Sequence, residues 1–142
     1  MQRGLATTNG NNRFLFAIDV SGSMNPRIVE RGLNNIIQHS GLKGDNHEVI
    51  FFDTRISSKY KLKDTYNIYK EARRYGGGTD VKALWEYAKP DDHLVIFTDG
   101  YIYDLSRLQP RTIPPIWVLT NEISRHYLDQ LTRLGELVQT NY

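Results

Sequence analysis

The stretch Phe14-Leu15-Phe16-Ala17-Ile18-Asp19-Val20-Ser21-Gly22-Ser23-Met24 decides how the rest of this sequence is interpreted. Its first residues form a short apolar run, which predicts a buried β-strand. The run ends in an Asp-x-Ser-x-Ser pattern made by Asp19, Ser21 and Ser23, which predicts a loop directly after the strand. Oxygen-bearing side chains at alternate positions of a tight loop can converge on one cation, and a glycine between them lets the loop turn without a Cβ clash. The stretch therefore predicts a strand that ends in a ligand loop.

Length and composition limit the classes of protein that fit. A chain of 142 residues predicts one domain over residues 13–142, after a polar, Gly/Asn-rich and flexible lead-in over residues 1–12. The formal charge of +2 is too small to indicate nucleic acid or a membrane surface as a partner. The absence of cysteine excludes disulfides, thiolate metal sites and a cysteine nucleophile. No apolar run approaches the roughly 20 residues that span a bilayer, and the polar start does not resemble a signal peptide, so we expect a cytoplasmic protein.

Further along the chain, apolar segments alternate with segments of helical periodicity. Strands that are apolar throughout and separated by helices are typical of a parallel sheet covered on both faces. The sequence therefore predicts an α/β fold with a doubly wound, mostly parallel sheet. Beyond the first strand, the expected elements are helices over 26–39, 66–75, 79–89 and 124–134, strands over 47–52, 93–98, 116–120 and 135–140, and an antiparallel edge strand over 56–62.

Polar residues follow two of the predicted parallel strands. Asp19 ends the first, Asp99 follows the strand over 93–98, and Thr79 follows a triple glycine. Right-handed crossovers place the loops after parallel strands on one edge of the sheet, which is also where ligands bind in such folds. If those two strands are neighbours, Asp19 and Asp99 face each other. The candidate ligands are all oxygens, which favours Mg²⁺, and Mn²⁺ or Ca²⁺ would also fit.

Three motifs in this order resemble the von Willebrand factor A (vWA) domain with its metal-ion-dependent adhesion site. They are Asp-Val-Ser-Gly-Ser-Met at 19–24, Gly-Gly-Thr-Asp at 77–80 and Phe-Thr-Asp-Gly at 97–100. The Phe-Phe-Asp-Thr turn at 51–54 and the Ile-Pro-Pro-Ile-Trp-Val-Leu segment at 113–119 resemble a compact intracellular type found in bacteria and phages. The resemblance extends from residue 14 to the end of the chain and implies a Rossmann-like vWA fold.

The resemblance also implies roles for the site residues. Ser21 and Ser23 would bind the metal directly through their hydroxyls, and Thr79 directly or through water. Asp19 and Asp99 would hold it mainly through waters and hydrogen bonds to the serines. The implied function is metal-dependent protein binding without catalysis, in which an Asp or Glu carboxylate of a protein ligand completes the ion. A MoxR-type AAA+ ATPase is the implied partner.

Two other functions compete with this interpretation. A metal-dependent hydrolase or phosphotransferase with Asp19 as nucleophile would need an acid two residues on, where the chain has Ser21, and a serine hydrolase would need a neighbouring base. His47 and His93 are expected at strand starts, on the opposite edge of the sheet. The basic stretch 55–74 could bind RNA, although a solvated surface is the simpler interpretation.

Simpler structural roles also remain for several polar residues. Thr79 could cap the helix that follows it, and Asp99 could be a turn residue before a glycine. Asp53 ends another strand on the same edge and is interpreted first as a turn residue. Tyr101 and Tyr103 either flank the site or pack against the sheet.

Overall fold

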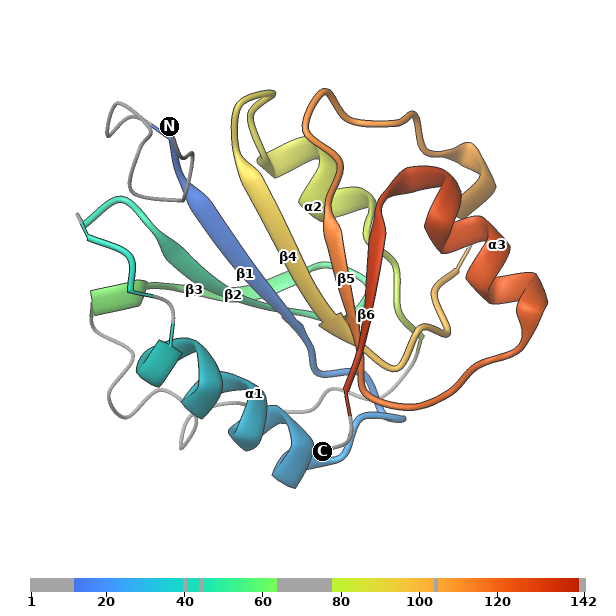
Figure 1. The fold of residues 1–142 in the computed structure, drawn as a ribbon, viewed down its shortest axis with the longest axis horizontal. Helices are drawn as coiled ribbons and strands as arrows, with labels where there is room; N and C mark the ends of the chain where they lie inside the picture. Colours follow the sequence, from blue (N-terminus) through green and yellow to red (C-terminus); the bar gives the residue numbers. More distant parts are fainter. Residues whose placement is uncertain (1–11, 40, 44, 64–77, 104, 141–142) are drawn as a thin grey trace.

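A six-stranded β-sheet forms the centre of the computed structural model (Figure 1). The structure describes residues 12–39, 41–43, 45–63, 78–103 and 105–140. The strand order is β3-β2-β1-β4-β5-β6, with only β3 antiparallel to its neighbour. The elements are β1 (Phe14–Asp19), α1 (Pro26–His39), β2 (Glu48–Phe52), β3 (Ile56–Lys61), α2 (Lys82–Tyr87), β4 (His93–Thr98), the 3-10 helix η3 (Leu105–Arg107), β5 (Ile116–Leu119), α3 (Arg125–Leu134) and β6 (Glu136–Gln139). The doubly wound α/β fold and its antiparallel edge strand are thus confirmed.

Strand β1 lies at the centre of the sheet, between β2 and β4. Ile18 of β1 is in register with Phe51 of β2 and with Phe97 of β4. The first and fourth strands are therefore neighbours, as the position of Asp19 and Asp99 at one edge requires. We use the term carboxyl edge for the edge of the sheet at which the parallel strands end. The predicted helix over 66–75 and nearly all of the lead-in over 1–12 lie outside the described residues.

The two faces of the sheet carry separate apolar cores. All six residues of β1 are buried, because alternate side chains enter opposite cores. Helix α1 packs over one face, while α2 and α3 lie over the other (Figure 1). The core on the α1 side contains Phe14, Phe16, Ile18, Val20, Met24, Val29, Val49, Phe51, Phe97 and Val118. The core on the α2 and α3 side contains Leu15, Ala17, Ile50, Phe52, Val81, Leu84, Ala88, Leu94, Ile96, Ile102, Leu105, Trp117, Leu119, Leu131 and Leu134.

Helix α2 begins later than the sequence predicts, at Lys82 instead of Thr79. The preceding residues are held in an extended loop, because Asp80 N donates to Asp53 O at 2.9 Å and Tyr103 N donates to Thr79 O at 2.7 Å. The N-cap residue is Val81, which makes no side-chain capping bond. Thr79 is therefore not the helix cap, and its hydroxyl is available for other contacts.

The described part of the chain contains no helix that combines the length and the apolar character needed to cross a membrane.

Candidate functional site

The loop after β1 turns tightly around the carboxylate of Asp19. Ser21 N donates to Asp19 Oδ1 at 2.8 Å, and Met24 N donates to Ser21 O at 3.0 Å. The two serine hydroxyls lie side by side, with Ser21 Oγ 3.3 Å from Ser23 Oγ. Asp19 and Ser21 are buried while Ser23 is exposed. The loop thus presents a row of oxygens that runs from the interior to the surface.

Thr79 reaches the same carboxylate from a different part of the chain. Its Oγ1 lies 3.4 Å from Asp19 Oδ1 and 3.3 Å from Asp19 Oδ2, and donates to both at the long end of hydrogen-bonding distance. Its backbone is fixed by the hydrogen bond that its carbonyl accepts from Tyr103. The segment after the triple glycine therefore joins the β1 loop, as the sequence motifs require.

Thr98, the last residue of β4, is a member of the site that sequence reasoning did not select. Its Oγ1 donates to Asp19 Oδ2 at 2.7 Å and accepts from Gly100 N at 3.1 Å. The signal was present in the strand pattern. Thr98 has the same parity as the buried Leu94 and Ile96, so it faces the side of the sheet toward which the Asp19 side chain points.

Asp99 lies directly beyond β4 and is 5% exposed. Its Oδ1 accepts from Tyr101 N at 3.2 Å, so it shapes the loop as a turn residue does. Gly100 has a φ of +91°, and a Cβ there would lie 2.8 Å from Ile123 Cδ1. The loop that positions Asp99 therefore depends on a glycine at its next residue.

The carboxyl group of Asp19 is held in an environment that disfavours its charge. Burial raises its pKa, hydrogen bonds from the Ser21 side chain and backbone and from Thr98 lower it, and the nearby negative charge of Asp99 raises it again. The net direction is upward. A cation beside Asp19 would reverse this balance, because an opposite charge favours the carboxylate.

Contacts connect four of the five predicted site residues at the carboxyl edge, and the fifth, Asp99, is close enough for its charge to raise the pKa of Asp19. Asp19 contacts Ser21 and Thr79 directly, Ser21 contacts Ser23, and the charge of Asp99 acts on Asp19. The donor set is two carboxylates and three hydroxyls, and within the described ranges no three His, Cys, Asp or Glu side chains gather as a metal site. Such a set fits a hard cation that keeps part of its water shell, as Mg²⁺ does.

The side chains of Asp53, His47 and His93 make structural contacts with residues outside this cluster. Asp53 Oδ1 accepts from the amides of Thr54 and Arg55 at 2.6 and 3.2 Å, the pattern of a turn residue. His47 Nδ1 accepts from Phe14 N at 3.0 Å, and the His93 ring stacks on that of Phe14 with centroids 4.4 Å apart. Both histidines are therefore at the opposite edge of the sheet from Asp19, where the sequence places them.

Of the two placements expected for Tyr101 and Tyr103, beside the site or packed against the sheet, the structure shows the first. Their side chains are 46% and 67% exposed, and the Tyr101 ring meets the Tyr127 ring edge-on at 5.1 Å. They line the surface beside the site and are not packed into the sheet. Of the basic stretch 55–74, the structure describes residues 55–63, where Lys59 Nζ lies 4.2 Å from the Tyr87 ring centroid and Lys63 pairs with Asp45 at 3.9 Å.

Comparison with known proteins agrees with this architecture. A family model described as "VWA-like domain (DUF2201)" matches residues 14–127, which include the loop after β1, Thr79 and the end of β4. No curated protein matches the chain. The chain belongs to this VWA-like family.

Proposed function

We propose that the chain is a metal-dependent protein-binding module whose site is built by Asp19, Ser21, Ser23, Thr79 and Asp99. One observation carries the proposal: three segments from distant parts of the chain, namely the loop after β1, the loop before α2 and the end of β4, bring oxygen-bearing side chains together around Asp19 at the carboxyl edge. The VWA-like family supports an interaction role of this kind.

The residues of the site divide into groups that hold the ion and groups that orient them. Ser21, Ser23 and Thr79 supply the hydroxyl ligands. Asp19 and Asp99 supply negative charge, and Thr98 orients Asp19 through its 2.7 Å hydrogen bond. When bound, a Mg²⁺-type ion offers an electrophilic position to an anionic oxygen, and an Asp or Glu side chain of a partner protein would occupy it.

Two observations favour binding over hydrolysis. The residue two positions after Asp19 is Ser21, whose hydroxyl cannot replace the acid that a phosphotransferase of the Asp-nucleophile type requires. His47 and His93 lie at the opposite edge of the sheet, so neither is placed to act as a base for the serines. The same site therefore serves better as a docking point than as a catalytic centre.

The partner that this proposal favours is a protein with an exposed acidic side chain. The resemblance to compact intracellular vWA proteins points to a MoxR-type AAA+ ATPase as the protein that presents this side chain. Within the present molecule, Ser23 supports access for such a ligand, because it is the exposed end of the oxygen row.

The metal site is tested by titrating isotopically labelled protein with Mn²⁺ and recording amide signals by NMR. We expect paramagnetic broadening to centre on Ser21, Ser23 and Thr79, and Mg²⁺ to reverse it by competition. The double variant Ser21→Ala with Ser23→Ala should lose the effect. Ser58→Ala with Ser124→Ala is the matched control, because Ser124 makes no side-chain capping bond and both residues lie outside the site.

The docking function is tested with a purified AAA+ partner in the presence of Mg²⁺ or EDTA. We expect binding that EDTA abolishes and that the double serine variant loses. Equal binding by the wild type and the double variant would contradict the proposal. Broadening spread over surface carboxylates without a centre at Ser21 would contradict the metal site itself.

A further inference from the structure

Asp53 follows β2 directly, and its side chain fixes the turn into β3. The carboxylate accepts through Oδ1 from Thr54 N at 2.6 Å and from Arg55 N at 3.2 Å, and Asp53 N donates to Arg55 O at 3.0 Å. The residue is 6% exposed. A carboxylate that accepts from the amides of the next two residues sets the course of the backbone there. The conformation of this turn therefore depends on the Asp53 side chain.

The carbonyl of Asp53 holds the segment that carries Thr79. Asp53 O accepts from Asp80 N at 2.9 Å. This carbonyl and the Thr54 N–H, which the Asp53 carboxylate binds, belong to the same peptide group. A peptide group is planar, so a bond that orients its N–H also orients its C=O. The side chain of Asp53 thus sets the direction in which its own carbonyl points.

The peptide group between Thr79 and Asp80 is held from both sides. Its N–H donates to Asp53 O at 2.9 Å, and its carbonyl, Thr79 O, accepts from Tyr103 N at 2.7 Å. One peptide group is thus fixed between the turn after β2 and the loop after β4. Because it directly follows the α-carbon of Thr79, these two bonds determine where the Thr79 side chain begins.

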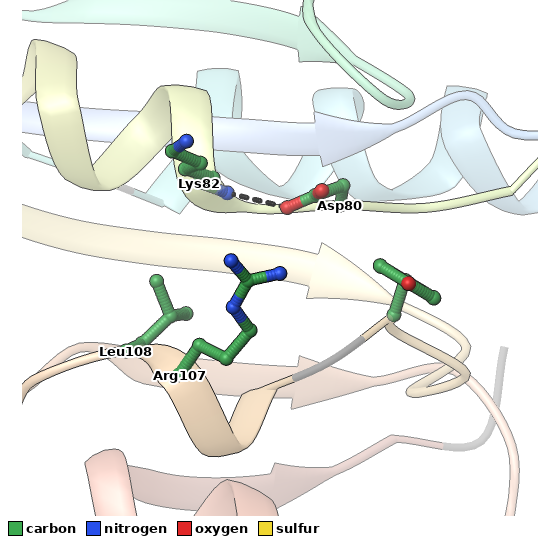
Figure 2. A pocket seen from close by; sticks show the side chains of 5 residues that line it. Asp80, Lys82, Arg107 and Leu108 are labelled. Carbon is green, nitrogen blue, oxygen red and sulfur yellow. Dashed lines mark hydrogen bonds between the residues drawn. The ribbon is translucent and has the colours of Figure 1, made fainter.

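On another side the same segment borders open space. Asp80 and Tyr103 line a pocket of about 300 Å³, and Gly78 is exposed. Figure 2 shows Asp80 at the start of α2, where its Oδ1 accepts from Lys82 N at 2.8 Å. Since side chains do not fill this space, hydrogen bonds of the backbone contribute strongly to the position of the segment.

The contact between Thr79 and Asp19 is sensitive to small movements of that backbone. Thr79 Oγ1 lies 3.3 Å from Asp19 Oδ2 and 3.4 Å from Oδ1. A displacement of about 0.3 Å away from Asp19 would put both distances beyond hydrogen-bonding range. The position of the Thr79 hydroxyl therefore depends on the bonds that hold its peptide group.

The end of β2 holds the loop after β1 as well. Phe52 O accepts from Val20 N at 2.8 Å, directly between Asp19 and Ser21 in the sequence. The carbonyls of the consecutive residues Phe52 and Asp53 thus bind the loop with the two serines and the segment with Thr79. This part of the chain fixes how far apart the two groups of hydroxyls lie.

We infer that Asp53 is a positioning residue of the candidate metal site. Its carboxylate orients the carbonyl that holds the Thr79–Asp80 peptide group, and this places the Thr79 hydroxyl beside Asp19. Asp53 acts through the backbone and is not a ligand of the ion. The inference rests on the proposed function and adds to the site a residue from a fourth segment of the chain.

Three substitutions separate the role of the turn from the role of the charge. Asp53→Asn keeps an acceptor oxygen and removes the charge, Asp53→Ser keeps a shorter acceptor, and Asp53→Ala removes it. The Mg²⁺ affinity of the full chain is measured by competition with Mn²⁺, from the broadening at Ser21 and Ser23. We expect Asp53→Asn to match the wild type and Asp53→Ala to bind Mg²⁺ about tenfold more weakly. Asp53→Ser should lie between them, and it takes the place of Asp53→Ala if that variant does not fold.

A double-mutant cycle tests whether Asp53 acts through Thr79. Thr79→Val removes the hydroxyl and keeps the shape of the side chain. In this background Asp53→Ala should weaken Mg²⁺ binding no further. Asp92→Asn, at the opposite edge of the sheet, is the control for a general loss of stability. It should lower the free energy of unfolding and leave the Mg²⁺ affinity unchanged.

Hydrogen exchange in EDTA tests the same bonds without a metal. The Asp80 amide should be protected in the wild type and in Asp53→Asn, because its bond to Asp53 O is intact. It should exchange faster in Asp53→Ala than in Asp92→Asn, which controls for global unfolding. This measurement does not depend on whether the site binds an ion.

The outcomes distinguish the inference from the proposed function. Equal weakening by Asp53→Asn and Asp53→Ala would assign the effect to charge and overturn the inference. An undiminished effect of Asp53→Ala in the Thr79→Val background, or unchanged Mg²⁺ affinity in the whole series, would also overturn it. If Mg²⁺ fails to reverse the broadening at Ser21 and Ser23 in the wild type, the proposed function is wrong. The exchange of the Asp80 amide then decides alone whether Asp53 holds the Thr79 segment, and unchanged protection in Asp53→Ala would show that it does not.

Discussion

Thr98 Oγ1 donates a 2.7 Å hydrogen bond to Asp19 Oδ2 across two neighbouring parallel strands, and both side chains are fully buried. The same hydroxyl accepts from Gly100 N at 3.1 Å. One threonine therefore links the carboxylate at the end of β1 to the loop after β4. This contact holds together the two halves of the candidate site.

Replacing Thr98 by valine keeps the shape of the side chain and removes both hydrogen bonds. We expect a loss of about 1–3 kcal/mol in the free energy of unfolding, because the Gly100 amide and the Asp19 carboxylate lose a buried partner. Urea denaturation measures the change. Thr112→Val, at an exposed residue, is the control. Equal stability of the two variants would contradict the linking role of Thr98.

Replacing Asp19 by asparagine tests the cost of the buried carboxylate. The pKa of Asp19 is raised, so the folded state holds this proton more tightly than the unfolded state does. The associated stability is fully present below the unfolded pKa of about 3.9 and is lost as pH rises through the folded pKa. In EDTA, the stability of the variant relative to the wild type should therefore increase from pH 4 to pH 7.

The stabilities of the wild type and of Asp19→Asn also test whether Mg²⁺ binds at this site. Mg²⁺ at a hundred times its dissociation constant should raise the free energy of unfolding of the wild type by about 2.7 kcal/mol and leave Asp19→Asn unchanged. Thermal or urea melts with Mg²⁺ and with EDTA measure the effect. A variant that Mg²⁺ stabilises as much as the wild type would exclude Asp19 from the site.

Gly100→Ala should destabilise the protein more than Gly41→Ala does. Both glycines have positive φ, +91° and +62°, so alanine is strained at each. At Gly100 the new methyl group would also lie 2.8 Å from Ile123 Cδ1, whereas at Gly41 no atom of the described residues beyond its chain neighbours lies within 4 Å. We expect about 1–3 kcal/mol more loss at Gly100, measured by urea denaturation. Equal losses would show that the clash is relieved without cost.

The ion pair between Arg13 and Asp92 should contribute stability that depends on pH. Arg13 donates to both carboxylate oxygens, at 3.2 and 2.8 Å. Burial raises the pKa of Asp92, but the hydrogen bonds from Arg13 and from Lys89 N, together with the charges of Arg13 and Arg111, outweigh it and lower the pKa overall. Asp92→Asn should cost about 1.5–3 kcal/mol at pH 7.

The stability from the Arg13–Asp92 ion pair should change with pH in the opposite direction to that expected for Asp19. A lowered pKa gives stability that is present above the unfolded value of about 3.9 and lost as pH falls through the folded value. The difference in the free energy of unfolding between the wild type and Asp92→Asn should therefore decrease below pH 4. Because the pair lies at the amino end of the sheet, Mn²⁺ broadening at Ser21 should be the same in both proteins.

Much of this architecture follows from local patterns in the sequence. The apolar run before Asp19 predicts a buried strand, because an uninterrupted apolar segment avoids water only when both faces of the sheet are covered. The geometry of the Asp-x-Ser-x-Ser loop and of the turn at the glycine after Asp99 also depends on neighbouring residues in the sequence. These features need no knowledge of the remaining chain.

Other features depend on contacts that no local pattern contains. The start of α2 is displaced from Thr79 because Asp53 and Tyr103 hold the loop with backbone bonds. The partnership of Thr98 with Asp19 depends on the register between β1 and β4. The position of η3 depends on Arg133 of α3, which donates to Leu105 O at 2.8 Å. Each is a tertiary contact, which the periodicity of a single segment does not encode.

The contacts around Asp19 join residues 60 and 79 positions apart in the chain, from Thr79 and Thr98 respectively. The Asp-x-Ser-x-Ser segment emerges early in synthesis, but its partners follow only when β4 has been made and has docked beside β1. The complete cluster can therefore form only after β4 has been synthesised. Ligand binding there would report that the centre of the sheet is complete, and a nascent or partly unfolded chain would present no docking point.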